Sequence, residues 1–221
     1  AVEVGSPMSP DLEIIKSLNP TVVVSVDTLG SDYMELFTQN NIPSEFVSLE
    51  SLNGLKEAIN TLGKRFDKEA EAESLLANLE AKEKEVAEKS AELESPEILV
   101  LFAAPGSTMI ATSKSYVGSL VEMVGGKNII ADNSTSFTTY NKEDLSMLNP
   151  DKILVMVHAL PEETQAALEK EMATDAAWQN IEAVRNGDVV YLDTSYFGMS
   201  ANLKVIEGLD ILSDIVHGNG E

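Results

Sequence analysis

Short apolar runs alternate along the chain with segments in which apolar residues recur every three or four positions. The runs include TVVVSV from Thr21, EILVLFAA from Glu97 and KILVMV from Lys152. Runs of this length are typical of buried parallel strands, whereas the spaced pattern is typical of amphipathic helices. The alternation predicts an α/β fold in which helices cover mostly parallel sheets.

One long segment, residues 66–93, contains neither Gly nor Pro and places apolar residues among acids and lysines. As a single amphipathic helix it would be about 42 Å long. Polar residues interrupt its apolar stripe, which favours a helix lying along a globular body over a coiled coil. We therefore predict an N-terminal lobe over 1–65, a connecting helix over 66–95 and a C-terminal lobe over 96–221.

Capping and turn residues predict further boundaries. Ser9–Pro10 resembles the N-cap and first position of a helix that ends near Asn19. Gly63 is expected to close a helix in the first lobe. Residues 104–115 and 134–140 are predicted to be loops.

A helix-to-strand corner occurs twice in the sequence. EIIKSLNP begins at Glu13 and EDLSMLNP begins at Glu143, and strand-forming residues follow each copy. The repeat predicts two related lobes with equivalent corners. The first copy lies much nearer the start of its lobe than the second, so the first lobe is expected to be N-terminally truncated. Any targeting or lipid-attachment segment is expected in the missing part.

Composition and charge exclude several functions. The chain has 37 acidic and 15 basic residues, a formal net charge of -22, and no cysteine. The charge repels phosphate backbones, so nucleic acid is not expected as a partner. The lack of cysteine excludes disulfides, thiolate metal sites and cysteine nucleophiles. No apolar run reaches the roughly 18 residues that a membrane-spanning helix needs.

Loops that follow the strands are expected to converge on a cleft between the lobes. Their side chains are apolar, aromatic or thioether groups with few cations. The set is Met8, Met109, Tyr116, Phe137, Tyr140, His158, Tyr196, Phe197 and Met199. Such walls suit the flat face of haem, whose iron accepts His and Met ligands. His158 follows a strand and faces this cleft, whereas His217 is expected to be a solvated residue at a helix end.

Two βα lobes joined by a long helix resemble the helix-linked substrate-binding proteins of ABC importers. The resemblance rests on VGSPMSPDLEIIKSLNPTVVV in the first lobe and SYVGSLVEMVGGKNII in the second. It implies a monomeric binding protein, not an enzyme, with haem, a siderophore or cobalamin as cargo. It also implies that Glu13 and Glu143 each dock onto an arginine of one ABC permease subunit. A carboxylate in the first turn of a short helix is favoured by the helix dipole and can pair with Arg.

Three stretches, two of them not yet quoted, look like the haem-binding lipoproteins of Gram-positive haem ABC importers. They are VGSPMSPDLE, VHALPEETQAALEKEM and AAWQNIEAVRNGDVVYLD. In that group a Met and a His from opposite lobes ligate the haem iron, and the matching residues are Met8 and His158. The resemblance implies haem (iron protoporphyrin IX) as the transported ligand and upstream surface haem-binding proteins as possible donors. It also implies a lipid-anchored protein on the extracellular face of the cell membrane.

Other interpretations stay open at this point. A ferric siderophore or cobalamin could replace haem, although the cleft offers few cations for an anionic siderophore. A chelatase-like enzyme would need a base such as His158 beside Glu162 or Glu163. The haem propionates could be bound by Lys114 or Lys142, and Met199 is a second thioether near the cleft. The expected cleft-lining set is Tyr116, Phe137, Tyr140, Tyr196, Phe197 and Met199.

Overall fold

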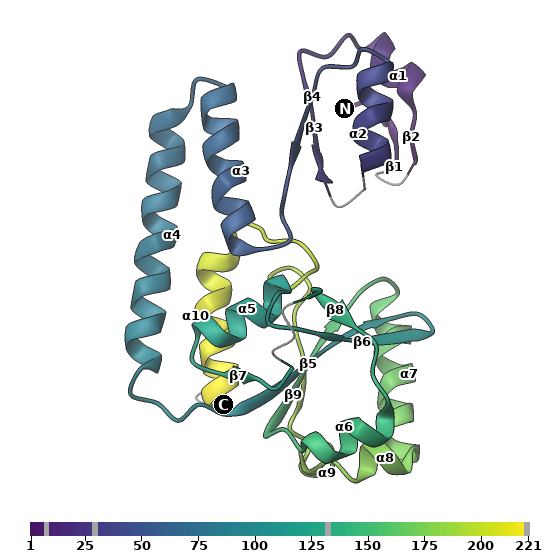
Figure 1. The fold of residues 1–221 in the computed structure, drawn as a ribbon, viewed down its shortest axis with the longest axis vertical. Coiled ribbons are helices and arrows are strands. Elements are labelled where there is room, and N and C mark those ends of the chain that lie inside the picture. The colour runs from purple at the N-terminus through teal and green to yellow at the C-terminus, as the bar shows by residue number, and fades with distance from the viewer. Residues whose placement is uncertain (7–8, 28–30, 131–133, 219–221) are drawn as a thin grey trace.

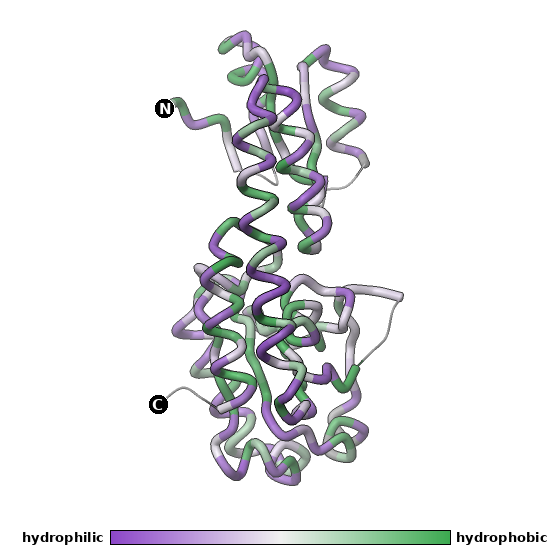
Figure 2. Tube along the Cα trace, turned by 90° about the vertical axis from the view of Figure 1, so that its left-hand side faces the viewer, coloured by the Kyte–Doolittle hydropathy of each residue, from purple (hydrophilic) through white to green (hydrophobic). Residues whose placement is uncertain are grey.

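The computed structural model describes the chain apart from residues 7–8, 28–30, 131–133 and 219–221. A small N-terminal lobe and a larger C-terminal lobe lie on the same side of a pair of long helices (Figure 1). In the side view of Figure 2 these two helices alternate between hydrophobic and hydrophilic positions along their length. None of the helices in the described residues is long and apolar enough to cross a membrane.

The N-terminal lobe is built around a parallel pair of strands and a small apolar core. Its elements are β1 (Gly5–Ser6), β2 (Ser9–Pro10), α1 (Leu12–Ser17), β3 (Val23–Val26), α2 (Ser31–Gln39) and β4 (Ser44–Val47). Strands β3 and β4 are parallel, and the buried core consists of Ile15, Phe37 and Ile42.

The predicted cap at Ser9–Pro10 is wrong. These residues form β2, which pairs antiparallel with β1, so they are held by strand pairing instead of starting a helix. Asp11 caps α1 because its Oδ1 accepts hydrogen bonds of 3.0 Å from the N–H groups of Glu13 and Ile14. Aspartate is a strong N-cap residue, so the helix begins where its first free N–H groups find an acceptor.

The helix pair consists of α3 (Leu52–Arg65) and α4 (Glu69–Ser90). Gly63 was expected to close the first helix, but it lies inside α3 and is buried. A Cβ added at Gly63 would lie 2.5 Å from the Cβ of Ala72 on α4. Gly63 therefore allows the two helices to approach each other closely and does not end α3.

The C-terminal lobe contains a larger mixed sheet. Its strands are β5 (Glu97–Ala104), β6 (Ser107–Ala111), β7 (Lys127–Asn128), β8 (Phe137–Thr138), β9 (Lys152–Val157) and β10 (Val189–Tyr191). The order is β10-β9-β5-β6-β8, with β7 also beside β5, and β5, β7, β9 and β10 run parallel. The expected α/β fold with mostly parallel sheets is confirmed. Strands β6 and β8 correct the predicted loops over 104–115 and 134–140, because both add antiparallel pairs at the sheet edge.

Helices cover both faces of this sheet. They are α5 (Tyr116–Met123), α6 (Lys142–Leu148), α7 (Pro161–Thr174), α8 (Ala176–Gln179), α9 (Glu182–Asn186) and α10 (Val205–His217). Alternate residues of β5 point to opposite faces, so Ile98 and Val100 enter one core while Leu99 and Leu101 enter the other. The first core also takes residues from α3, α4, α5 and α10. A strand buried on both faces explains the continuous apolar run EILVLFAA.

The chain leaves the N-terminal lobe after β4 and enters the helix pair through residues 48–51. The N–H of Ala201 donates a 2.7 Å hydrogen bond to the carbonyl of Leu49, which ties this link to the C-terminal lobe. Leu52 and Leu55 at the start of α3 are buried in the core of that lobe. Residues 52–65, placed in the first lobe by the sequence prediction, thus pack against α4 and the larger lobe.

Candidate functional site

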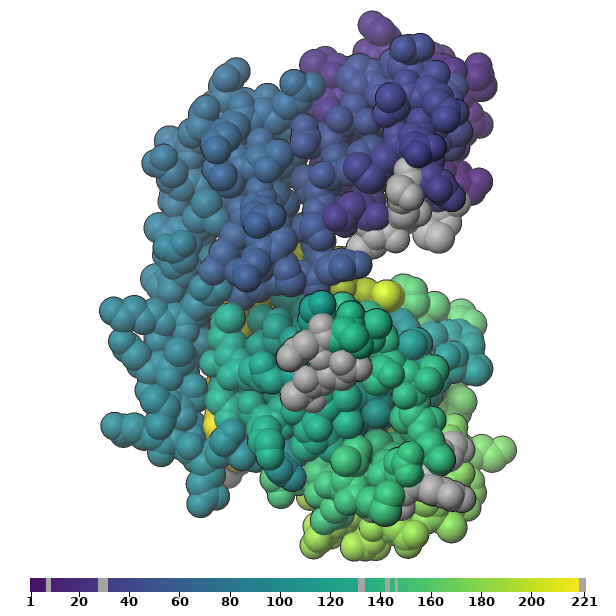
Figure 3. All heavy atoms as spheres, in the orientation of Figure 1, coloured from purple at the N-terminus to yellow at the C-terminus, as the bar shows by residue number. Residues whose placement is uncertain are grey.

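A hollow separates the two lobes on the side away from the helix pair, as the space-filling view in Figure 3 shows. The segment between β10 and α10 lies on the C-terminal lobe's side of this hollow, shown in yellow in Figure 1. Loops after parallel strands are the usual place for ligand sites in such folds.

His158 follows the last residue of β9 at a strained turn. Its backbone N–H donates a 2.8 Å hydrogen bond to the carbonyl of Ala103 on β5, which extends the strand pairing by one residue. Ala159 and Leu160 then have φ values of 61° and 42°, in the left-handed region that side chains other than glycine rarely adopt. Pro161 begins α7 directly afterwards. Strain of this kind is found most often at functional sites, where the surrounding structure holds it.

The imidazole of His158 is exposed and lies beside an aromatic ring. Its ring centroid is 5.7 Å from that of Phe102, with 31° between the ring planes. Across the part of the chain that the structure describes, no hydrogen bond involves either ring nitrogen of His158. A structural histidine would normally be held by such a bond. His158 is therefore a candidate ligand residue.

A cavity of about 220 Å³ adjoins His158. Its walls come from the ends of β5 and β9, the start of α7 and the segment before α10. They are Phe102, Met156, Val157, His158, Ala159, Pro161, Thr194, Phe197, Gly198 and Met199. Most of these residues have apolar side chains, two of them thioethers, and polar atoms contribute nearly half of the exposed wall.

The other sequence-predicted ligand, Met8, lies outside the described residues. Met199, the second thioether considered for the cleft, lines the same cavity as His158 and is 44% exposed. Phe197 also lines this cavity although its side chain is buried. Tyr196 is half-buried, and its hydroxyl is 3.3 Å from Glu207 Oε2.

Tyr116 does not line the cleft in this structure and is a correction to the expected set. Its side chain is 1% exposed and belongs to the core of the C-terminal lobe, where burial raises the pKa of its phenol. The reason is the helix start: Ser115 caps α5 by accepting a 3.0 Å hydrogen bond from the N–H of Gly118. The first helical residue then points toward the sheet.

Two other aromatic residues of the expected set, Phe137 and Tyr140, lie on opposite faces of the sheet. Phe137 packs against Phe102, with ring centroids 5.1 Å apart, and so lies near the His158 cavity. Tyr140 packs against Trp178, with centroids 6.0 Å apart, on the other face of the sheet. Phe102 was missed by the sequence prediction because it lies inside the apolar run of β5.

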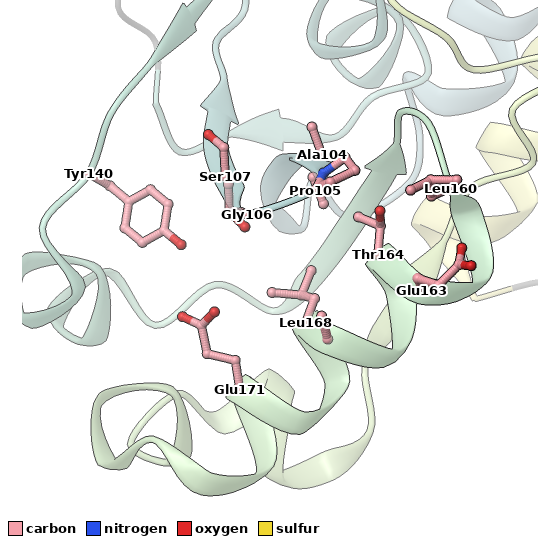
Figure 4. A pocket seen from close by; sticks show the side chains of 13 residues that line it. Ala104, Pro105, Gly106, Ser107, Tyr140, Leu160, Glu163, Thr164, Leu168 and Glu171 are labelled. Atoms are coloured by element: carbon pink, nitrogen blue, oxygen red, sulfur yellow. The ribbon is translucent and has the colours of Figure 1, made fainter.

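A larger cavity, of about 490 Å³, lies between the β5–β6 turn and α7. Figure 4 shows Tyr140 and Glu171 facing each other across it. Its walls carry the carboxylates of Glu163 and Glu171 and no basic side chain. The indole N–H of Trp178 donates a 3.3 Å hydrogen bond to Glu171 Oε1. Two carboxylates disfavour the anionic carboxylates of haem, so the smaller cavity beside His158 is the candidate site.

The two expected docking glutamates lie in the first turns of equivalent short helices. Glu13 is in α1, with a side chain that is 90% exposed and 3.8 Å from Lys16 Nζ. Glu143 is in α6, and its side chain is not among those that the structure describes. Among the lysines considered for the propionates, Lys114 is exposed just before α5, and the side chain of Lys142 is likewise not described.

His217 differs from the expected solvated histidine. Its Nε2 lies 2.6 Å from the carbonyl oxygen of Val124, and the side chain is part-buried. It therefore joins the C-terminal end of α10 to that of α5. The carbonyl groups at a helix end need partners, and a histidine ring from a neighbouring helix supplies one here.

Two α/β lobes, linked through long helices and separated by a hollow, have the architecture of a two-lobed ligand-binding protein. The chain belongs to the periplasmic binding protein family, which it matches over residues 1–196. Members and relatives are ABC transporter substrate-binding proteins, so the protein is a binding protein and not an enzyme. The chelatase-like alternative is therefore wrong.

Individual relatives agree with this assignment. The high-affinity heme uptake system protein IsdE of Staphylococcus aureus is 34% identical over 216 residues, which span 97% of this chain and 74% of IsdE. Its crystal structure complexed with heme has a TM-score of 0.89, with 97% of this chain and 84% of that chain covered. An ABC transporter substrate-binding protein from Listeria monocytogenes EGD-e has a TM-score of 0.90 at 35% identity, covering 98% of this chain and 84% of that one.

A more distant structure has the same fold. The petrobactin-binding protein YclQ of Bacillus subtilis has a TM-score of 0.80 at 23% identity, covering 97% of this chain and 76% of that chain.

Proposed function

We propose that the protein captures haem in the cleft between its lobes and delivers it to the permease of an ABC importer. The observation that carries the proposal is His158, whose imidazole is exposed, free of hydrogen bonds in the described structure and set at the edge of a cavity lined mostly by apolar residues. Similarity to a heme uptake protein over nearly the whole chain supports the same cargo.

In this proposal His158 and Met8 are the axial ligands of the haem iron. His158 lies in the C-terminal lobe and Met8 in the N-terminal lobe, so one metal ion would hold both lobes around the porphyrin. Neutral imidazole and thioether are established axial ligands of haem iron. Phe197 and Met199 would supply apolar contacts to the porphyrin from the C-terminal lobe.

The haem propionates require donors at the rim of the cleft. Lys114 precedes α5, and Lys204 precedes α10, where its Nζ is 5.2 Å from the ring centre of Tyr196. Either ammonium group could pair with a carboxylate.

Delivery to the importer would use Glu13 and Glu143, one from each lobe, as docking residues for the two permease subunits. We place the protein on the extracellular face of the cell membrane, held there by a lipid anchor and supplied by surface haem-binding proteins.

Titration of the purified protein with hemin tests this function. We expect saturation at one hemin per chain and a low-spin Soret spectrum, because His and Met together give a strong ligand field. His158→Ala and Met8→Ala should each lose that spectrum. His217→Ala is the matched control, since His217 is the only other histidine and bonds within the C-terminal lobe. A spectrum unaltered in both ligand variants would refute the assignment of His158 and Met8 as axial ligands.

The alternative cargo is a ferric siderophore or cobalamin, bound in the same cleft. Parallel equilibrium titrations with hemin, a ferric catecholate siderophore and cyanocobalamin would separate these cargoes. Tighter binding of either alternative than of hemin would overturn the haem proposal while leaving the binding class intact.

A further inference from the structure

Phe102 and His158 lie on the same face of the C-terminal sheet. Phe102 pairs with Met156 in the parallel register of β5 and β9, and His158 follows Met156 by two positions. Residues two apart in a strand point to the same side, so His158 is the diagonal neighbour of Phe102. The bond from the His158 N–H to the Ala103 carbonyl, 2.8 Å, continues this pairing and fixes the backbone of His158.

The two rings form a tilted stack. Their centroids are 5.7 Å apart and their planes are inclined by 31°, within the range at which aromatic pairs attract each other. Because both ring nitrogens carry their lone pair or proton in the ring plane, the stack restricts rotation of the ring without occupying either nitrogen.

Phe102 is itself held from a second direction. The ring of Phe137 on β8 lies 5.1 Å from that of Phe102 at 52°. The backbone of Phe102 is fixed by β5, whose neighbouring residues Leu101 and Ala103 are buried. Phe102 is thus a rigid surface, whereas His158 belongs to an exposed turn.

A histidine that binds a metal is usually oriented by a hydrogen bond from its second nitrogen to a carboxylate or carbonyl. Within the described ranges of this chain, no residue makes such a bond to His158. We propose that Phe102 takes this role as a positioning residue: it orients the His158 imidazole by stacking so that a ring nitrogen points toward the iron. This inference rests on the proposed function, with His158 as a haem-iron ligand.

Stacking has a consequence that a carboxylate partner would not have. A carboxylate raises the basicity of the ligand imidazole, whereas a phenyl ring orients it without adding charge. The iron–imidazole bond would then owe its strength to preorganised geometry. A carrier that must pass its cargo on benefits from a ligand that is well placed and yet exchangeable.

The test compares Phe102→Leu with Phe102→Tyr and with the control Phe46→Leu. Leucine keeps an apolar side chain but removes the ring face, whereas tyrosine keeps the face. Phe46 is a similarly half-buried ring in the N-terminal lobe, 5.6 Å from Phe37 and remote from His158 in sequence. We expect Phe102→Leu to weaken hemin affinity by about tenfold and to convert part of the complex to high spin, as removal of an orienting partner does. Phe102→Tyr and Phe46→Leu should keep the low-spin spectrum.

A second measurement uses the ligand-free protein and does not depend on haem. The chain has only two histidines, so the imidazole signals of His158 and His217 can be told apart by NMR. Loss of the Phe102 ring current should move the His158 ring-proton signals and leave those of His217 in place. Unmoved His158 signals, or a Phe102→Leu protein that ligates hemin as the parent does, would overturn the positioning role. A parent protein that fails to bind hemin would instead refute the proposed function, and shifted His158 signals would still show that the Phe102 ring contacts the imidazole in the ligand-free protein.

Discussion

Asn19 and Asn149 have nearly the same unusual backbone conformation, with φ values of 46° and 40°. Each follows the end of a short helix, α1 or α6, and each precedes a proline and then a parallel strand. The sequence repeat is therefore also a structural repeat. Asparagine is among the few residues other than glycine that tolerate the left-handed region, which explains its presence in both copies.

The two asparagines should respond differently to substitution. Asn149 Oδ1 accepts a 2.9 Å hydrogen bond from the N–H of Glu182 and thus caps α9 from outside. We expect Asn149→Gly to keep the backbone conformation and lose this bond, at a cost of about 1 kcal/mol in the free energy of unfolding. Asn149→Ala should cost about 2 kcal/mol because the left-handed strain is added. Asn19→Gly is the matched control and should be nearly neutral in urea unfolding.

Two glycines within helices should also differ. A Cβ at Gly118 in α5 would lie 2.0 Å from the carbonyl oxygen of Thr112, whereas at Gly208 in α10 the nearest atoms are 3.5 Å away. Gly118→Ala should destabilise the protein by about 2 kcal/mol or more, because the backbone of the capping turn must move. Gly208→Ala should be neutral or stabilising, since alanine favours helix over glycine. Equal shifts of the melting temperature would contradict this reading of the packing.

Acid should weaken the cluster of ion pairs that Glu85 forms on α4. Hydrogen bonds from Lys82 and then Lys89 lower the pKa of Glu85 from 4.5 to about 2, and Lys82 also pairs with Asp210 on α10 at 2.8 Å. A carboxyl whose pKa is lower in the folded state stabilises the fold above its unfolded pKa. That contribution is lost as the pH falls from about 4.5 toward 2.

Glu85→Gln should therefore flatten the loss of stability over this acid range, as measured by urea unfolding at successive pH values. The size of the effect should be modest and should shrink at high salt, because the pair is exposed. Glu73→Gln on the same helix, which forms no ion pair in the described structure, should leave the acid profile unchanged. If Glu85→Gln does not alter the acid profile, the lysines lower the pKa of Glu85 as much in the unfolded chain as in the folded one.

The parts of the fold predicted best from sequence are those fixed by burial. EILVLFAA and KILVMV became β5 and β9 with the predicted bounds, because a strand buried on both faces must be apolar throughout. Strand β6 was missed because its turn, Pro105–Gly106, follows β5 so closely that the pair reads as one strand and a loop. The helix cap moved from Ser9 to Asp11 because β1 pairs with residues 9–10, a contact that no local pattern reveals.

The candidate site was likewise predicted only in part from the sequence. His158 could be placed because a strand end in an α/β lobe has a known direction. Phe102 could not, because its nearness to His158 depends on the register between β5 and β9. Tyr116 was predicted to line the cleft, but it is buried against the sheet. The sequence does not show whether the first residue of a capped helix faces the solvent or the sheet.

Docking onto the permease should depend on both Glu13 and Glu143, and their substitution should leave haem binding intact. Glu13 is almost fully exposed in the first turn of α1, and Glu143 holds the same position in α6. Glu13 is not among the residues that line the His158 cavity. We expect Glu13→Gln and Glu143→Gln each to lower haem-stimulated ATPase activity of the reconstituted importer several-fold, by removing a charge-assisted pair with an arginine. The double variant should lose nearly all stimulation, since neither lobe then keeps its contact with the permease.

The same variants should bind hemin with the affinity of the parent protein. Unchanged affinity would show that the substitutions affect docking and not the capture of haem. Glu80→Gln, an exposed position on α4, is the matched control for loss of one negative charge. Because the chain carries a formal net charge of -22, a general attraction to a basic permease would respond alike to Glu80, Glu13 and Glu143. Equal losses from all three substitutions would therefore argue for diffuse steering, whereas losses confined to Glu13 and Glu143 would establish two specific contacts, one for each lobe.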